Sequence, residues 1–157
     1  LWDNYREGQR EERSEQFIAA LDQLEAGNLG PASDAMDPVI ADGGGDVAAI
    51  ARMLKAGIAL EQNDAAGAAR MFAAVAASSD APQPLRELAT VREVAATYDT
   101  LPPAQVIARL RSIAVPGNQY FGSAGELVAM AHLEQGNRRE AGALFAAIAK
   151  HEGVPET

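Results

Sequence analysis

The sequence predicts an all-α fold, a stack of about four degenerate helical hairpins that begins with a long N-terminal helix. A short phrase recurs three times, as LEAGN at 24–28, LEQND at 60–64 and LEQGN at 133–137. The second copy begins 36 residues after the first, and the third begins 73 residues after the second, which leaves room for one unmarked unit. Repeats of this length are typical of stacked helical hairpins.

Composition also favours closely packed helices. The chain is 48% hydrophobic but only 5% aromatic, and alanine is its dominant apolar residue. Alanine is the best helix former and lets two helices approach closely, whereas sheets depend on β-branched and aromatic residues. At 157 residues the chain is long enough for one domain with a real core, so we predict a single domain over residues 1–157.

Charge and cysteine content exclude several classes of protein. The formal net charge is −9 and no basic stripe is visible, so we exclude an unselective nucleic-acid binder. The absence of cysteine rules out disulfides and thiolate metal sites. No apolar run approaches the ~20 residues that cross a bilayer. Because the first residue is Leu1 and not methionine, we expect a chain cut from a longer one, in which a signal or anchor would lie upstream of Leu1.

Residues 1–26 are predicted to form one long helix with two different halves. Its second half carries an apolar stripe at three- and four-residue steps, made of Phe17, Ile18, Leu21 and Leu24. Residues 1–13 are strongly charged and have almost nothing to bury apart from Leu1, Trp2 and Tyr5. Such a segment suits the turns just outside a membrane, where aromatic rings lie at the interface. It equally suits a frayed terminal helix whose two rings pack onto the domain.

Breaks in the pattern divide the rest of the chain into hairpins. The predicted units cover residues 14–42, 46–78, 84–114 and 120–150, and residues 151–157 form a tail. Pro38 should kink or shorten the helix in which it falls. The glycines at 43–45 form a flexible joint, after which Asp46 is a good N-cap for the next helix.

The third unit keeps the helical spacing but lacks the repeated phrase. Tyr98 stands where the turn should be, and Pro103 opens a helix that extends to Ile113. In the fourth unit Ser123 and Glu126 have the spacing of a capping box, which predicts the start of the next helix.

Small and bulky residues recur at matched positions around the repeated turns. Alanines stand seven residues before and five residues after each turn, where the two helices of a hairpin can cross. A bulky residue follows four places later and fills the gap toward the adjacent unit. These predicted packing residues are Ala20, Ala32 and Met36 in the first unit, Ala56, Ala68 and Phe72 in the second, and Ala129, Ala141 and Phe145 in the fourth.

This arrangement resembles the tetratricopeptide repeat (TPR) family. The likeness is carried by Ala56, residues 63–64, Ala68 and Phe72, and again by Ala129, residues 136–137, Ala141 and Phe145. It implies a right-handed stack of TPR-like hairpins. Units of 36 residues are longer than the ~34 typical of that family, and the surplus lies in the linkers.

A narrower resemblance is to the ancillary SecYEG translocon subunit (YfgM-like) family. It is carried by the N-terminal stretch with residues 2–6 (WDNYR), Gln9, Ser14 and Phe17, followed by four alanine-rich degenerate repeats. The resemblance implies a single membrane-spanning helix just before this stretch, with the repeats on the periplasmic side of the bacterial inner membrane. It also implies association with the SecYEG translocon and with periplasmic chaperones. The alternative location is cytoplasmic.

No residue pattern indicates catalysis, a cofactor or a metal. His132 and His151 lack a second ligand at metal spacing, and His132 is better explained as structural or surface. Glu25, Glu61 and Glu134 occupy equivalent repeat positions, so they are better explained as one row on one face than as an acid–base pair. We therefore predict a protein that is not an enzyme and holds no cofactor.

The predicted function is a non-catalytic protein–protein interaction scaffold. The first helices of stacked hairpins line the concave side, where methionines and the glutamate row could meet a partner. The candidate partner-binding residues are Phe17, Leu21, Met53, Gly57, Glu61, Val91, Met130 and Glu134. The apolar members of this set are alternatively ordinary core residues, and Tyr98, Tyr120 and Phe121 are either exposed anchors or core. The alternative function is a self-associating structural domain unrelated to protein export, in which helix 1–16 pairs between copies of a homodimer.

Overall fold

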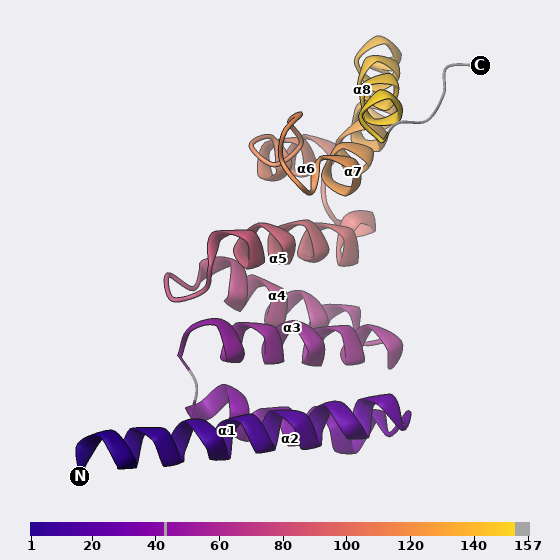
Figure 1. The fold of residues 1–157 in the computed structure, drawn as a ribbon. Helices are drawn as coiled ribbons and strands as arrows, with labels where there is room; N and C mark the ends of the chain where they lie inside the picture. The colour runs from indigo at the N-terminus through magenta and orange to yellow at the C-terminus, as the bar shows by residue number, and fades with distance from the viewer. Residues whose placement is uncertain (43, 153–157) are drawn as a thin grey trace. The chain divides into compact units, whose positions relative to one another are not determined.

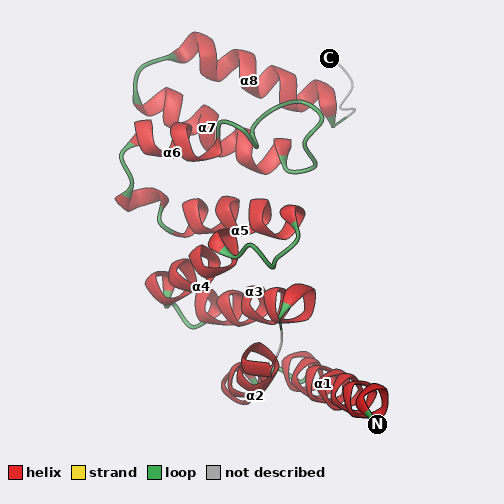
Figure 2. Ribbon diagram, turned by 90° about the vertical axis from the view of Figure 1, so that its left-hand side faces the viewer, coloured by secondary structure: helices red, strands yellow, loops and turns green. Residues whose placement is uncertain are grey.

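The computed structural model describes residues 1–42 and 44–152, which form helices joined by turns and loops (Figures 1 and 2). Within them the chain forms eight α-helices and one short 3-10 helix, η1 (Tyr98–Thr100), with no strand. The α-helices are α1 (Trp2–Glu25), α2 (Leu29–Asp42), α3 (Gly45–Glu61), α4 (Ala65–Ala77), α5 (Gln83–Ala96), α6 (Pro103–Leu110), α7 (Phe121–Glu134) and α8 (Arg138–His151). The predicted all-α class of consecutive helical hairpins is confirmed.

The chain divides into two compact units, Leu1–Arg86 (unit 1) and Glu87–Thr157 (unit 2), where the sequence predicts one domain. The boundary falls in the first turn of α5. Helices that follow one another in the chain pack together. In unit 1 these pairs are α1 with α2, α2 with α3, and α3 with α4; in unit 2 they are α6 with α7, and α7 with α8. Each unit is therefore a stack of consecutive helices.

The core of unit 1 is built on small residues at helix crossings. Ala20, Met36, Val39 and Ala51 form one cluster of buried side chains. The structure also buries the other predicted packing residues of this unit completely, namely Ala32, Ala56, Ala68 and Phe72. An alanine at a crossing lets two helix backbones approach, and the neighbouring Met or Phe then fills the space beside it.

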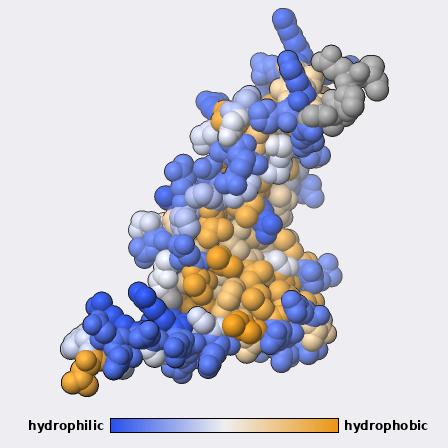
Figure 3. Space-filling view, in the orientation of Figure 1, coloured by the Kyte–Doolittle hydropathy of each residue, from blue (hydrophilic) through white to orange (hydrophobic). Residues whose placement is uncertain are grey.

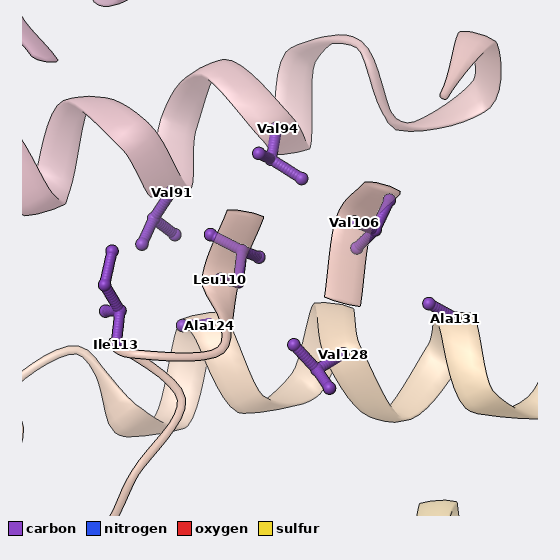
Figure 4. Packing of buried hydrophobic residues seen from close by; sticks show 8 residues of the cluster. All are labelled: Val91, Val94, Val106, Leu110, Ile113, Ala124, Val128 and Ala131. Carbon is purple, nitrogen blue, oxygen red and sulfur yellow. The ribbon is translucent and has the colours of Figure 1, made fainter. Parts of the chain in front are cut away.

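The core of unit 2 holds the third hairpin together although that hairpin lacks the repeated phrase. Figure 4 shows eight buried side chains of this cluster directed toward one another: Val91, Val94, Val106, Leu110, Ile113, Ala124, Val128 and Ala131. They come from α5, α6, α7 and the segment that follows α6. Ala129 and Ala141 are fully buried where α7 and α8 cross.

The repeated phrase forms the same turn in all three places. Gly27, Asn63 and Gly136 have φ angles of +79°, +61° and +79°, the left-handed region that glycine and asparagine tolerate best. The next residue donates its backbone N–H to a carbonyl five residues earlier, as in Asn137 to His132 at 2.8 Å. This is the hydrogen-bond pattern of a Schellman helix end, and it explains why the phrase recurs.

Two predicted helix starts differ from the structure. α3 begins at Gly45, so Asp46 lies in its first turn and is not the N-cap. α7 begins at Phe121, two residues before Ser123, whose Oγ donates a 3.3 Å hydrogen bond to the carbonyl of Tyr120. The predicted capping box is therefore wrong, because the serine hydroxyl is used inside the first turn.

Two prolines act differently from each other. α2 continues through Pro38 to Asp42, so the predicted shortening does not occur. α6 ends at Leu110 and not at Ile113, and residues 111–113 form a turn. The backbone N–H groups of Ile113 and Ala114 both donate to the carbonyl of Leu110. Pro116 keeps the helix from resuming, since it has no N–H to donate to the carbonyl four residues earlier and its ring crowds that carbonyl. Gly43 of the predicted joint and residues 153–157 of the predicted tail lie outside the described residues.

Candidate interaction surfaces

Part of the predicted partner-binding face is exposed. Glu61 and Glu134 are exposed as the last residues of α3 and α7, and Met130 is 39% exposed one turn before Glu134. Gly57 is half-buried, and a Cβ placed on it would meet no atom within 4 Å. α3 in unit 1 and α7 in unit 2 each offer an open strip that ends in a carboxylate.

The other members of the predicted face belong to the core. Met53 is 6% exposed and Val91 4% exposed, so neither side chain is available to a partner. Phe17 and Leu21 are half-buried because they pack against the buried cluster of unit 1. The spacing of these residues identifies a buried helix face and does not separate it from a partner-binding face.

Three aromatic residues that the sequence left as anchors or core pack as core in unit 2. Phe121 is 2% exposed, and Tyr98 and Tyr120 are half-buried against the cluster shown in Figure 4. Burial raises the pKa of Tyr98 above its usual 10.0, and the negative charge of Glu134 raises it further. Burial also raises the pKa of Tyr120, followed by the charge of Glu87. Both phenols therefore remain protonated at neutral pH.

The last helix exposes a face that its counterpart in unit 1 buries. Phe145 in α8 occupies the repeat position of Phe72 in α4, yet Phe72 is fully buried and Phe145 is 38% exposed. Gly142, Ala146 and Ala149 lie on the same side of α8 and are exposed as well. α8 packs on α7, and no helix follows it within the described residues. These four residues of α8 form an uncovered apolar surface, here called the α8 face.

A groove in unit 1, here called the basic groove, was not anticipated from the sequence. Its volume is about 380 Å³, and α2, α3, α4 and the turn before α4 contribute its walls. The lining residues are Asp37, Ile40, Arg52, Lys55, Asp64, Gly67, Arg70, Met71 and Ala74. The spacing of Arg52 and Lys55 on one helix is the only local sign of it, because Arg70 reaches them only after the hairpin has folded.

The two histidines contribute to the packing of α7 and α8. Within the described residues no group of three or more His, Cys, Asp or Glu side chains is placed to hold a metal ion. The Nε2 atom of His132 lies 3.5 Å from a carboxylate oxygen of Glu140, which links α7 to α8. The ring of His151 meets the ring of Phe121 edge-on, with centroids 5.5 Å apart.

The N-terminal part of α1 is an exposed stretch of helix. Residues 1–12 are all exposed, with Trp2 77% and Tyr5 66% exposed. Figure 3 shows this end of α1 as an apolar tip followed by a hydrophilic stretch. No helix in the part of the chain that the structure describes is long and apolar enough to cross a bilayer.

The fold consists of helical hairpins that are closed by one recurring turn and have small residues where the helices cross. Together with the exposed apolar strips, these features define a helical-repeat protein of the class that binds other proteins. The chain belongs to the tetratricopeptide repeat-like domain family, whose model matches residues 1–154 and so spans both units. Domains of this family mediate protein–protein interactions and are generally non-catalytic. Comparison with curated proteins and with solved structures gave no match.

Proposed function

We propose that this chain is a non-catalytic scaffold that binds other proteins through the last hairpin of unit 2. One observation carries the proposal: Met130, Leu133 and Phe145 are 39%, 48% and 38% exposed on the pair α7–α8. Burying a side chain of this size is worth about 1.5–3 kcal/mol when it starts fully exposed. A partner that covers these three partly exposed side chains gains part of that free energy of burial. The carboxylate of Glu134 favours a basic segment of the partner.

We further propose that the partners are components of the Sec translocon and periplasmic chaperones, on the periplasmic side of a bacterial inner membrane. The resemblance of the N-terminal stretch to YfgM-like proteins supports this assignment. The exposed rings of Trp2 and Tyr5 on an otherwise charged helix support a position next to a membrane. Aromatic rings favour the interface because one end of each is apolar and the other is polar.

Site-specific photo-crosslinking in cells that express the full-length protein tests both parts. A crosslinking amino acid is placed at Met130, and a matched one at Asp80, an exposed polar residue in the loop after α4. We expect translocon or chaperone adducts at Met130 and none at Asp80. Adducts at Met130 with other proteins alone would refute the translocon assignment, and no adduct at Met130 would refute binding through this hairpin.

Self-association is the second candidate function. The observation in its favour is the row of exposed residues 1–12 at the start of α1. If residues 1–16 pair between copies, removing them should abolish a dimer in sedimentation experiments. A monomer at tens of micromolar for the intact chain argues against this candidate.

A further inference from the structure

We propose that the basic groove of unit 1 binds acidic segments of partner proteins that carry an apolar side chain between their carboxylates. The proposal rests on the scaffold function and adds the chemistry of what is bound and where. The groove is on a different unit from the α7–α8 hairpin, so the two proposals can fail separately.

Salt bridges among the described residues pair only one of the three cations that line the groove. Lys55 forms a salt bridge with Asp37, which neutralises that pair. Arg52 and Arg70 line the same groove, and within the described residues neither of them forms a salt bridge. An arginine guanidinium offers a planar fork of N–H donors that matches a carboxylate. Two such groups at one groove therefore favour an anionic ligand.

The second acidic residue of the groove is committed to its own helix. The Oδ1 atom of Asp64 accepts a 2.9 Å hydrogen bond from the backbone N–H of Gly67 and caps the N-terminus of α4. A Cβ at position 67 would lie 2.1 Å from Oδ2 of Asp64, so the glycine allows the carboxylate this close approach. The carboxylate of Asp64 is thereby directed to the N-terminus of α4. Three cations, Arg52, Lys55 and Arg70, line the groove against two anions, Asp37 and Asp64, which leaves an excess of one positive charge.

The groove also has an apolar part that selects among acidic ligands. Ile40 and Met71 are half-buried in it, and Ala74 lines it from the next turn of α4. Methionine adapts its shape to varied apolar side chains. The volume of the groove, about 380 Å³, lies at the low end of the range for ligand pockets. A few side chains of an extended or helical segment would fill it, whereas a folded domain would not fit.

The net charge of the chain makes this groove selective. With a formal net charge of −9 the molecule as a whole repels acidic partners. An acidic segment that binds must therefore find the local positive field of Arg52 and Arg70. Binding should weaken with added salt, because the ion pairs at an open groove are screened.

Fluorescence anisotropy with the intact chain and a labelled EELEELEE peptide tests the proposal. We expect the peptide to bind and the matched QQLQQLQQ peptide not to bind. Arg52→Glu with Arg70→Glu should weaken binding at least about tenfold, the effect of losing two exposed ion pairs and gaining repulsion. The control, Arg111→Glu with Arg138→Glu in unit 2, makes the same change in net charge at exposed positions and should leave affinity within about twofold of the parent.

Two further variants keep the test valid if the double charge reversal fails to fold. Arg52→Gln with Arg70→Gln removes the charges with little change of shape. Ala74→Glu places a carboxylate in the groove at an exposed position, and Ala108→Glu in α6 is its match outside the groove. The proposal would be overturned if the folded groove variants bound EELEELEE as tightly as the parent. It would also be overturned if the parent did not bind EELEELEE, or if it bound anionic phosphatidylglycerol vesicles and not the peptide. Crosslinking at Met130 would remain unaffected in each of these cases.

Discussion

Phe72 and Phe145 occupy the same repeat position, but the first is buried and the second is partly exposed. Replacing each by alanine therefore measures how much burial at this position contributes to the free energy of unfolding. Phe72 is fully buried, so Phe72→Ala removes a whole ring from a closed core and should lower the free energy of unfolding by about 3–5 kcal/mol. Phe145 is 38% exposed, so about 60% of its transfer free energy is at stake and no closed cavity forms. Phe145→Ala should therefore cost about 1–2 kcal/mol.

Urea denaturation followed by far-UV circular dichroism is the suitable assay, since helices are the regular elements of the described residues. Fluorescence of Trp2 is unsuitable because that ring is already 77% exposed in the folded chain. The two phenylalanines lie in different compact units, so each variant is compared with the parent for the transition that it changes. Equal losses for the two variants would show that repeat position and not burial sets the contribution, and the argument would be wrong.

Two other predictions concern the α4 cap and the tyrosines of unit 2. Gly67→Ala should destabilise by about 1–2 kcal/mol because its Cβ displaces the Asp64 cap; in an Asp64→Ala background, where no carboxylate remains to clash, the same change should stabilise by roughly 1 kcal/mol as an ordinary helical Gly→Ala replacement. A thermodynamic cycle over the four proteins checks this reversal of sign, and destabilisation in both backgrounds contradicts it. The raised pKa of Tyr98 favours the protonated phenol in the folded state, so its contribution is complete below pH 10.0 and is lost as pH rises through the folded-state pKa. Tyr98→Phe should therefore lose less thermal stability between pH 9 and pH 11 than the parent, and parallel losses would contradict the assignment.

Local chemistry made the hairpins predictable. The left-handed residue of each turn must be glycine or asparagine, so Gly27, Asn63 and Gly136 mark the helix ends in the sequence itself. Alanine at a fixed distance from each turn follows from the close approach of two helices, and Ala56 and Ala68 are fully buried as that argument requires. Both signals depend on residues near one another in the chain.

The surfaces were less predictable because exposure depends on which helix lies opposite. Phe72 and Phe145 occupy the same repeat position, yet Phe72 is fully buried and Phe145 is 38% exposed. The basic groove combines side chains from three helices, and no stretch of sequence shows Arg52 and Arg70 together. The division into two units falls between Arg86 and Glu87, inside the continuous helix α5 and just after Pro84, which lies in the first turn of that helix and does not interrupt it.

The alanine crossings also determine which mutations the chain tolerates. About half of the buried hydrophobic residues within the described segments are alanines, and many of these have no exposed surface at all. Truncating an alanine removes a single methyl group, whereas enlarging one forces two helix backbones apart and typically costs 1–3 kcal/mol. Most replacements of alanine enlarge it. The most destabilising core substitutions in this fold should therefore be those that enlarge an alanine. In a protein whose core is filled with large residues, the most destabilising ones are those that make a side chain smaller.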